Sequence, residues 1–164
     1  MAKVQELNAL GREEFTSALA PVFEHSSWVA EETWPRRPFR DAVHLHAELC
    51  ATMRAASPER QLALIRAHPD LVGRDLLTAE SKSEQASAGL GELSSEEIER
   101  FREYNARYRE RFGFPFVICA RLNKKQAILD ALPIRLQNSR EKETEIALRE
   151  IFKIADLRLQ DLVE

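Results

Sequence analysis

The chain has 164 residues, of which 44% are hydrophobic and 31% are charged, and its formal net charge is −3. This length is typical of one globular domain, which we place at residues 1–164. No apolar run approaches the ~20 residues of a membrane span, and the slightly negative charge gives no reason to expect a nucleic-acid partner. The chain starts without a secretory signal and ends without a peroxisomal address, so we expect a cytoplasmic protein.

Helical patterns fill the first part of the chain. An early apolar face consists of Phe15, Leu19, Val22 and Phe23. A longer helix follows Pro38 and is predicted to place its apolar side at Val43, Leu45, Leu49 and Met53. A shorter helix begins at Ser57-Pro58, because proline suits the first helical position.

Helix boundaries are clearest in the second half. Ser94 and Glu97 form a capping box, and Gly113 is expected to stop the helix that follows. Asn123 is predicted to cap a further helix that breaks or kinks at Pro133. Asn138 with Glu141 is then predicted to start the last helix.

One short stretch, residues 116–120, is predicted to be extended. It is β-branched and aromatic, it follows Pro115, and it is too short for a helix. With no second strand available, its backbone groups need other partners, and a ligand is one such partner. The sequence therefore predicts an all-α fold, a single-domain helical bundle with one short extended segment near residues 115–120.

His68 stands directly before Pro69. Proline disfavours helical backbone at the residue before it, so a helix should end near Ala67 and hold the imidazole at a junction between helix and loop. A histidine in this place either acts as an acid and base or only hydrogen-bonds the last helical carbonyls. The pattern alone leaves both interpretations open.

Ser81, Glu84 and Gln85 are spaced i, i+3 and i+4, so one face of a helix carries all three side chains. The same residues also fit a capping box that starts at Ser81, with Gly89 as the stop. Gln85 favours a recognition face, because a cap needs no amide there and a ligand with urea-like edges does.

Arg121 ends the extended segment and offers a guanidinium to a carboxylate, although an ordinary surface arginine is the alternative. His44 and His46 are two residues apart on a predicted helix, which makes them a poor metal pair. No cysteine-histidine metal motif, glycine-rich phosphate loop or Ser-His-Asp signature is present, so we predict no metal.

Together these blocks resemble a known family. The resemblance is carried by residues 67–71, 74–76, 81–85, 109–113 and 114–121. In these blocks the chain is similar to the 2-oxo-4-hydroxy-4-carboxy-5-ureidoimidazoline (OHCU) decarboxylases of urate breakdown, and the similarity runs over about residues 7–163.

The resemblance implies a cofactor-free decarboxylase that converts OHCU to (S)-allantoin. It assigns the general acid and base role to His68, and it assigns Glu84 to holding N–H groups and assisting proton movement. The substrate-binding residues that it implies are Pro69, Ser81, Gln85, Phe116, Val117, Ile118, Ala120 and Arg121. It also implies a homodimer, for which apolar faces near the last helix could supply the contact.

Two other classes of function remain open from the sequence. A non-catalytic helical interaction module would explain the amphipathic helices but would give Ser81, Glu84 and Gln85 no task. A hydrolase of 5-hydroxyisourate would share the recognition of a similar ring.

Overall fold

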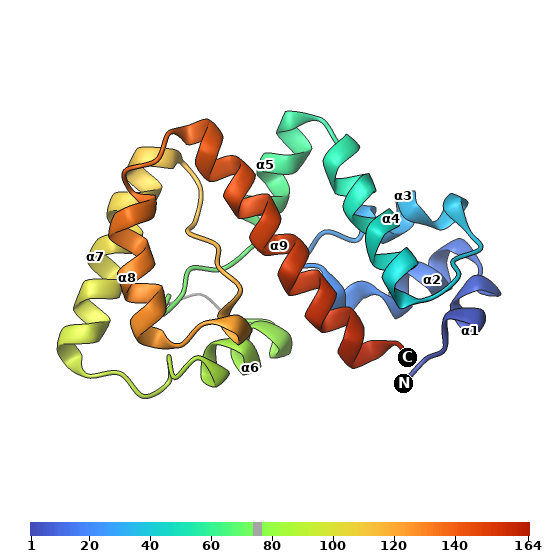
Figure 1. The fold of residues 1–164 in the computed structure, drawn as a ribbon, viewed down its shortest axis with the longest axis horizontal. Helices are drawn as coiled ribbons and strands as arrows, with labels where there is room; N and C mark the ends of the chain where they lie inside the picture. The colour runs from blue at the N-terminus through green and yellow to red at the C-terminus, as the bar shows by residue number, and fades with distance from the viewer. Residues whose placement is uncertain (74–76) are drawn as a thin grey trace. The chain divides into compact units, whose positions relative to one another are not determined.

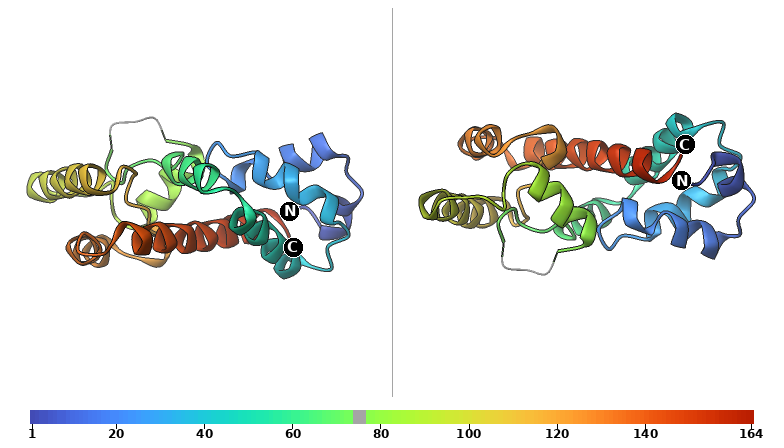
Figure 2. Two further views of the ribbon diagram at one scale, coloured as in Figure 1. Left: turned by 90° about the horizontal axis from the view of Figure 1, so that it is seen from above. Right: turned by 90° about the horizontal axis from the view of Figure 1, so that it is seen from below.

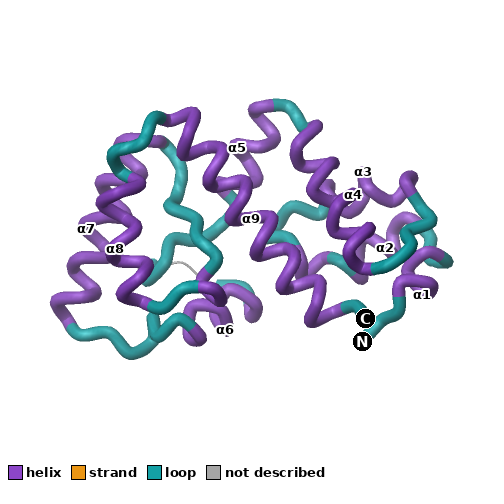
Figure 3. Tube along the Cα trace, viewed as in Figure 1, coloured by secondary structure: helices purple, strands orange, loops and turns teal. Residues whose placement is uncertain are grey.

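The computed structural model describes residues 1–73 and 77–164, and it shows them as helices joined by loops (Figures 1 and 3). No β-strand occurs among these residues, although an isolated bridge pairs Ala2 with Val163. The predicted all-α fold is confirmed. Arg74, Asp75 and Leu76, which carry part of the family resemblance, lie outside the described residues.

The chain divides into two compact units. The first combines Met1–Ala67 with Phe152–Glu164, and the second is the continuous stretch His68–Ile151. Helix α9 (Arg140–Leu162) begins in the second unit and ends in the first. A single domain over residues 1–164 stays a prediction.

The first unit packs short helices around an apolar core. The early apolar face is buried as predicted, with Phe15 and Leu19 fully enclosed. Helix α4 buries Leu45 and Leu49, but Val43 is 79% exposed, so its predicted place on this face is wrong. Position 43 lies about half a turn from position 45 and therefore points to the opposite side. The elements of this unit before α9 are α1 (Val4–Asn8), α2 (Arg12–Ala18), η1 (Ala20–Val22), α3 (Trp28–Thr33), η2 (Trp34–Arg36), α4 (Ala42–Ala55) and α5 (Pro58–Arg66).

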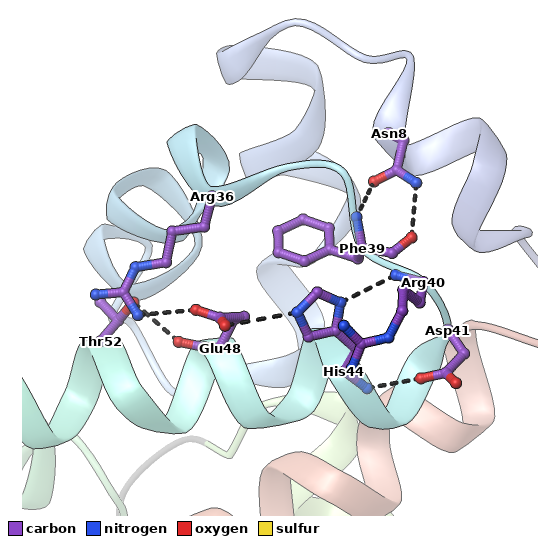
Figure 4. A network of polar contacts seen from close by, with 8 residues as sticks. All are labelled: Asn8, Arg36, Phe39, Arg40, Asp41, His44, Glu48 and Thr52. Atoms are coloured by element: carbon purple, nitrogen blue, oxygen red, sulfur yellow. Dashed lines mark hydrogen bonds and ion pairs between the residues drawn. The ribbon is translucent and has the colours of Figure 1, made fainter.

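A polar network surrounds the start of α4 (Figure 4). The Asp41 carboxylate accepts a hydrogen bond from the His44 N–H at 2.8 Å and caps the helix. The His44 ring accepts a hydrogen bond from the Arg40 N–H at 3.0 Å, and its other nitrogen lies 3.5 Å from Glu48. His46 instead contacts a backbone carbonyl of α9 at 2.9 Å. The two histidines thus have separate partners.

The second unit is built on α7 (Ser95–Phe112), and the sequence predicted both ends of this helix correctly. The Ser94 hydroxyl accepts a hydrogen bond from the Glu97 N–H at 3.2 Å, and the Glu97 carboxylate accepts one from the Ser94 N–H at 3.0 Å. Gly113 closes the helix with a φ of 78°, a left-handed conformation that glycine adopts without a steric penalty. Helices α7 and α8 lie side by side (Figures 1 and 2). The other elements of this unit before α9 are α6 (Ala79–Ser87), η3 (Ala120–Leu122) and α8 (Lys125–Arg135).

Three predicted boundaries in this unit are wrong. Lys124, not Asn123, precedes α8, because the Asn123 amide donates to the backbone of the extended segment at 2.9 Å. Pro133 lies inside α8, so the predicted break does not occur, while the alternative kink stays a prediction; buried apolar side chains on both sides keep the helix packed. The Ser139 hydroxyl, and not the Asn138 side chain, accepts a hydrogen bond from a backbone N–H in the first turn of α9. The Asn138 amide instead donates to a buried carboxylate.

An aromatic cluster anchors the chain after α7. Tyr108, Phe112, Phe114 and Phe116 are all buried, and the Tyr108 and Phe116 ring centroids are 5.5 Å apart in an edge-to-face arrangement. From this anchor the segment, orange in Figure 1, runs to η3, which contacts α6. Ala120 is the first residue of η3, so its predicted place in the extended stretch is wrong. The aromatic cluster therefore fixes one end of the predicted extended segment, and α6 meets the other.

Candidate active site

His68 occupies the predicted junction between helix and loop. Helix α5 ends at Arg66, Ala67 is its C-cap, and no regular helix continues into Pro69. The His68 side chain is buried, with 6% of the residue exposed. The predicted junction is therefore confirmed, and the structure adds that the imidazole at this junction is buried.

The loop that follows His68 is fastened by α6 and α7. The Arg109 Nε lies 3.0 Å from each carboxylate oxygen of Asp70, and Asn105 donates its amide to the Leu71 carbonyl at 2.7 Å. The Gln85 Oε1 accepts a hydrogen bond from the Val72 N–H at 3.2 Å. These contacts hold the histidine-bearing loop against two helices of the same unit.

Val72 adopts an unusual backbone conformation in this loop. Its φ is 56°, in the left-handed region, which is strained for a β-branched residue. The Gln85 amide contacts the loop on both sides of Leu71, since its Nε2 also donates to the Asp70 carbonyl at 3.5 Å. Gln85 thus supports a backbone shape that the loop would not adopt alone.

Helix α6 presents the three polar residues that the sequence placed on one face. Ser81 and Gln85 are buried and Glu84 is half-buried, whereas the intervening Lys82 and Ser83 are exposed. The common face is therefore confirmed.

The capping-box interpretation of Ser81 is wrong. The hydroxyl of Thr78 caps α6 by accepting a hydrogen bond from the Ser81 N–H at 3.1 Å, so Ser81 is already inside the helix. Gly89 follows the helix end with a φ of 85°, as predicted for a stop. The Glu84 side chain is therefore not the partner of Ser81 in an N-terminal capping box.

The extended segment has two differently occupied sides. The Val117 carbonyl accepts a hydrogen bond from Arg135 at 2.6 Å, and the Cys119 N–H donates to Glu150 at 3.1 Å. In extended backbone the peptide groups of alternate residues point to opposite sides. The N–H groups of Phe116, Ile118 and Ala120 have no hydrogen-bond partner among the described residues. One side is thus bound to protein, and the other has donors to offer.

Glu84 lies within electrostatic reach of this segment. Burial raises the pKa of the Cys119 thiol, and the nearby carboxylates of Glu150 and Glu84 raise it further. Helix α6 also contacts η3, where Ala120 is buried and Arg121 is exposed. The structure therefore brings together the loop after His68, the polar face of α6 and the end of the extended segment.

Sequence reasoning missed the residues that support these three parts. They are Asp70, Val72, Asn105, Arg109, Arg135, Glu143 and Glu150. A local signal existed for two of them, because Glu143 and Glu150 fall at helical spacing among buried apolar residues of α9. Charged residues on a buried helical face need partners, although sequence does not say which.

Among residues 1–73 and 77–164, no group of three or more His, Cys, Asp or Glu side chains is placed to hold a metal ion. Over the same part of the chain, no helix combines the length and apolar character needed to cross a bilayer. Neither Cys50 nor Cys119 forms a disulfide within the described residues, and burial raises the pKa of the Cys50 thiol to about 11.

Solved structures share this fold. A crystal structure of (S)-allantoin synthase matches with a TM-score of 0.81 and 30% identity; the match covers the whole of this chain, which spans 54% of that protein. A crystal structure of an OHCU decarboxylase in the presence of (S)-allantoin matches with a TM-score of 0.71 and 27% identity, over 84% of this chain and 92% of that one.

Sequence comparison agrees with the structural matches. A family model described as OHCU decarboxylase matches residues 8–160. The 2-oxo-4-hydroxy-4-carboxy-5-ureidoimidazoline decarboxylase of Halalkalicoccus jeotgali is 42% identical over 159 residues, which cover 97% of this chain and 90% of that protein. The family resemblance found in the sequence is thereby confirmed: this chain belongs to the OHCU decarboxylase family.

Proposed function

We propose that this chain is a carboxy-lyase that converts OHCU to (S)-allantoin in urate breakdown. Family membership supports the proposed reaction, and one structural observation supports the proposed location of the substrate-binding site. The extended segment is bound to protein on one side, while the N–H groups of Phe116, Ile118 and Ala120 remain available on the other. A ring with carbonyl and ureido groups offers the acceptors that such a row of donors requires.

The substrate can accept the electrons of its own decarboxylation. When the bond between the ring carbon and the carboxylate breaks, the electron pair moves into the neighbouring carbon–nitrogen double bond of the ring. Carbon dioxide leaves, and a proton must then reach one face of the ring. We therefore propose a reaction without a cofactor, since no external electron sink is required.

In this proposal His68 is the general acid and base at the hydroxyl and carboxyl end of the substrate. Its burial and its place before Pro69 restrict the imidazole, which favours proton delivery to a single face. Glu84, half-buried on α6, holds ring or ureido N–H groups and assists proton movement. Ser81, buried on the same face, fixes a polar edge of the ring.

Gln85 has two tasks in this proposal. Part of its amide already binds the loop, at the Val72 N–H and the Asp70 carbonyl. An amide has two N–H donors and an oxygen with two lone pairs, so capacity remains for the substrate. We propose that Gln85 joins substrate binding to the shape of the loop.

The remaining substrate contacts come from the two ends of the site. Pro69 and Val117 shape the backbone that borders the site. Arg121, exposed in η3, complements the substrate carboxylate. We further propose a homodimer, which the family resemblance implies, and a location in the cytoplasm, in keeping with two cysteines that form no disulfide. Sedimentation of the purified chain and cell fractionation test these two points.

Freshly prepared OHCU, followed by circular dichroism, tests the function. The uncatalysed reaction yields racemic allantoin, so a growing signal of (S)-allantoin together with released carbon dioxide supports the proposal. A ring-opened product from 5-hydroxyisourate, without carbon dioxide, would identify a hydrolase instead. No turnover of either compound by the folded chain would favour a non-catalytic interaction module.

A further inference from the structure

A buried charged cluster lies behind the extended segment. The Arg135 Nε donates to the Glu143 carboxylate at 2.8 Å, while its Nη1 donates to the Val117 carbonyl at 2.6 Å. Tyr108 donates its hydroxyl to the same carboxylate, and the Asn138 amide donates to the other oxygen at 2.7 Å. Arg135 is 7% exposed and Glu143 is fully buried. Side chains from three helices of one unit therefore meet at the Glu143 carboxylate, and one of them, Arg135, also binds a backbone carbonyl of the candidate site.

Arg135 and a second buried residue, Glu150, also hold neighbouring groups of the segment. The Arg135 guanidinium lies 4.2 Å from the centre of the Phe116 ring, a cation–π contact. Cys119 follows Ile118, and the buried Glu150 carboxylate accepts a hydrogen bond from the Cys119 N–H at 3.1 Å. The Phe116 side chain, the Val117 carbonyl and the Cys119 N–H are thus all fixed from the protein side.

Stability alone does not account for this arrangement. Replacing a buried ion pair by apolar residues of similar volume is often neutral or stabilising, because the charges must lose their water. The Arg135 Nη2 is buried without a hydrogen-bond acceptor, which adds to that cost. What the charges provide, and apolar residues could not, is a directional hold on the two backbone groups of Val117 and Cys119.

We propose that Arg135 and Glu150 are positioning residues for the substrate. By binding one side of the segment, they turn the N–H groups of Ile118 and Ala120 toward the other side, where the substrate binds. Glu143 and Tyr108 act one step further back, by fixing the Arg135 guanidinium. This inference rests on the proposed function for its chemistry, but the fixed backbone can be tested without turnover.

The chain contains a matched control. In the first unit, Arg158 donates to the Glu24 carboxylate at 2.8 Å and to the Pro21 carbonyl at 3.4 Å, and both charged residues are buried. This is also a buried arginine that binds a glutamate and a backbone carbonyl. None of the proposed site residues belongs to that unit.

Arg135→Lys and Arg158→Lys should therefore be compared. Both variants lose the forked geometry of arginine, and both should melt at a lower temperature. Only Arg135→Lys should lower kcat/KM for OHCU, by about tenfold or more, because a small displacement of binding groups weakens transition-state contacts. It should also speed hydrogen exchange in peptides covering residues 114–122, whereas Arg158→Lys should leave their exchange unchanged.

Glu150 provides a second test if Arg135→Lys does not fold. Glu150→Gln keeps an oxygen that can accept the Cys119 N–H, so it should retain most of the turnover, while Glu150→Ala should lose it. Equal losses of kcat/KM in the Arg135 and Arg158 variants, or equal activity in the two Glu150 variants, would overturn the inference. An inactive parent chain whose 114–122 exchange still responds only to Arg135→Lys would instead refute the proposed function and keep the positioning role.

Discussion

Glu84→Gln separates a chemical role of this residue from a structural one. Glutamine preserves the shape of the side chain but carries no negative charge and cannot take up a proton. The cap of α6 is the hydroxyl of Thr78, more than a turn earlier in the chain, so the helix start does not depend on Glu84. We expect this variant to lose turnover and to keep nearly all of its stability.

The expected magnitudes differ enough to be resolved. A positioned acid or base contributes ~10²- to 10⁴-fold in rate. That factor corresponds to roughly 3–6 kcal/mol of transition-state stabilisation, at about 1.4 kcal/mol for each tenfold change. Thr78→Ala is the matched control on the same helix: losing this cap should cost about 1 kcal/mol, or roughly 2–4 °C in melting temperature, and should leave kcat close to that of the parent.

Thermal melting and (S)-allantoin formation should be measured on the same preparation of each variant. We expect opposite patterns, with Glu84→Gln stable and inactive and Thr78→Ala less stable and active. A Glu84→Gln protein that melts early but still forms (S)-allantoin at the parent rate would refute the chemical role of Glu84. Glu84 would then be a structural residue of α6.

The remaining predictions concern proton transfer, metals and pH. His68→Asn should fold and lose ~10²- to 10⁴-fold in rate, and near-parent turnover of OHCU would contradict its assignment. Turnover should persist after exhaustive chelation, because the substrate is its own electron sink; loss of activity that one added metal restores would count against this. Hydrogen bonding to the Ser94 N–H lowers the pKa of Glu97, so the stability that its charge provides is present above the ordinary carboxyl pKa and disappears as pH falls through the lowered value. The melting temperature of the parent should therefore exceed that of Glu97→Ala most at neutral pH, and this difference should shrink in acid. A difference that grows in acid would be inconsistent with a stabilising Glu97 charge.

Local signals in the sequence were reliable where one interaction decided the structure. The capping box of Ser94 and Glu97 and the glycine stop at Gly113 both depend on residues within a turn of each other, and both were predicted correctly. The steric effect of Pro69 on His68 is equally local. Such features need no knowledge of the rest of the fold.

Where two local solutions competed, the sequence could not choose between them. Thr78 and Ser81 each place a hydroxyl before a short helical stretch, and only the fold shows that Thr78 is the cap. Asn123 and Asn138 have good capping side chains, but the Asn123 amide donates to the Cys119 carbonyl four residues earlier, and the Asn138 amide donates to the Glu143 carboxylate five residues later. Other local hydrogen bonds replaced the predicted caps in these cases.

The supporting residues of the site were beyond prediction for a related reason. The Gln85 contact with Val72 and the Arg135 contact with Val117 join segments that are well separated in the chain. Hydrophobic periodicity shows which face of a helix is buried, but not which backbone group a buried charge will meet. The sequence therefore named the residues that we propose to react, but it did not show the residues that support them.

The division of the chain has a consequence for the order of folding. The second unit is continuous, whereas the first unit needs Phe152–Glu164 to join Met1–Ala67. During synthesis, the ion pair between Glu24 and Arg158 can therefore form only after nearly the whole chain has emerged from the ribosome. The unit with the candidate site can become compact first, and the segment made earliest is completed last. Pulsed hydrogen exchange during refolding should show protection in α7 before protection in α4.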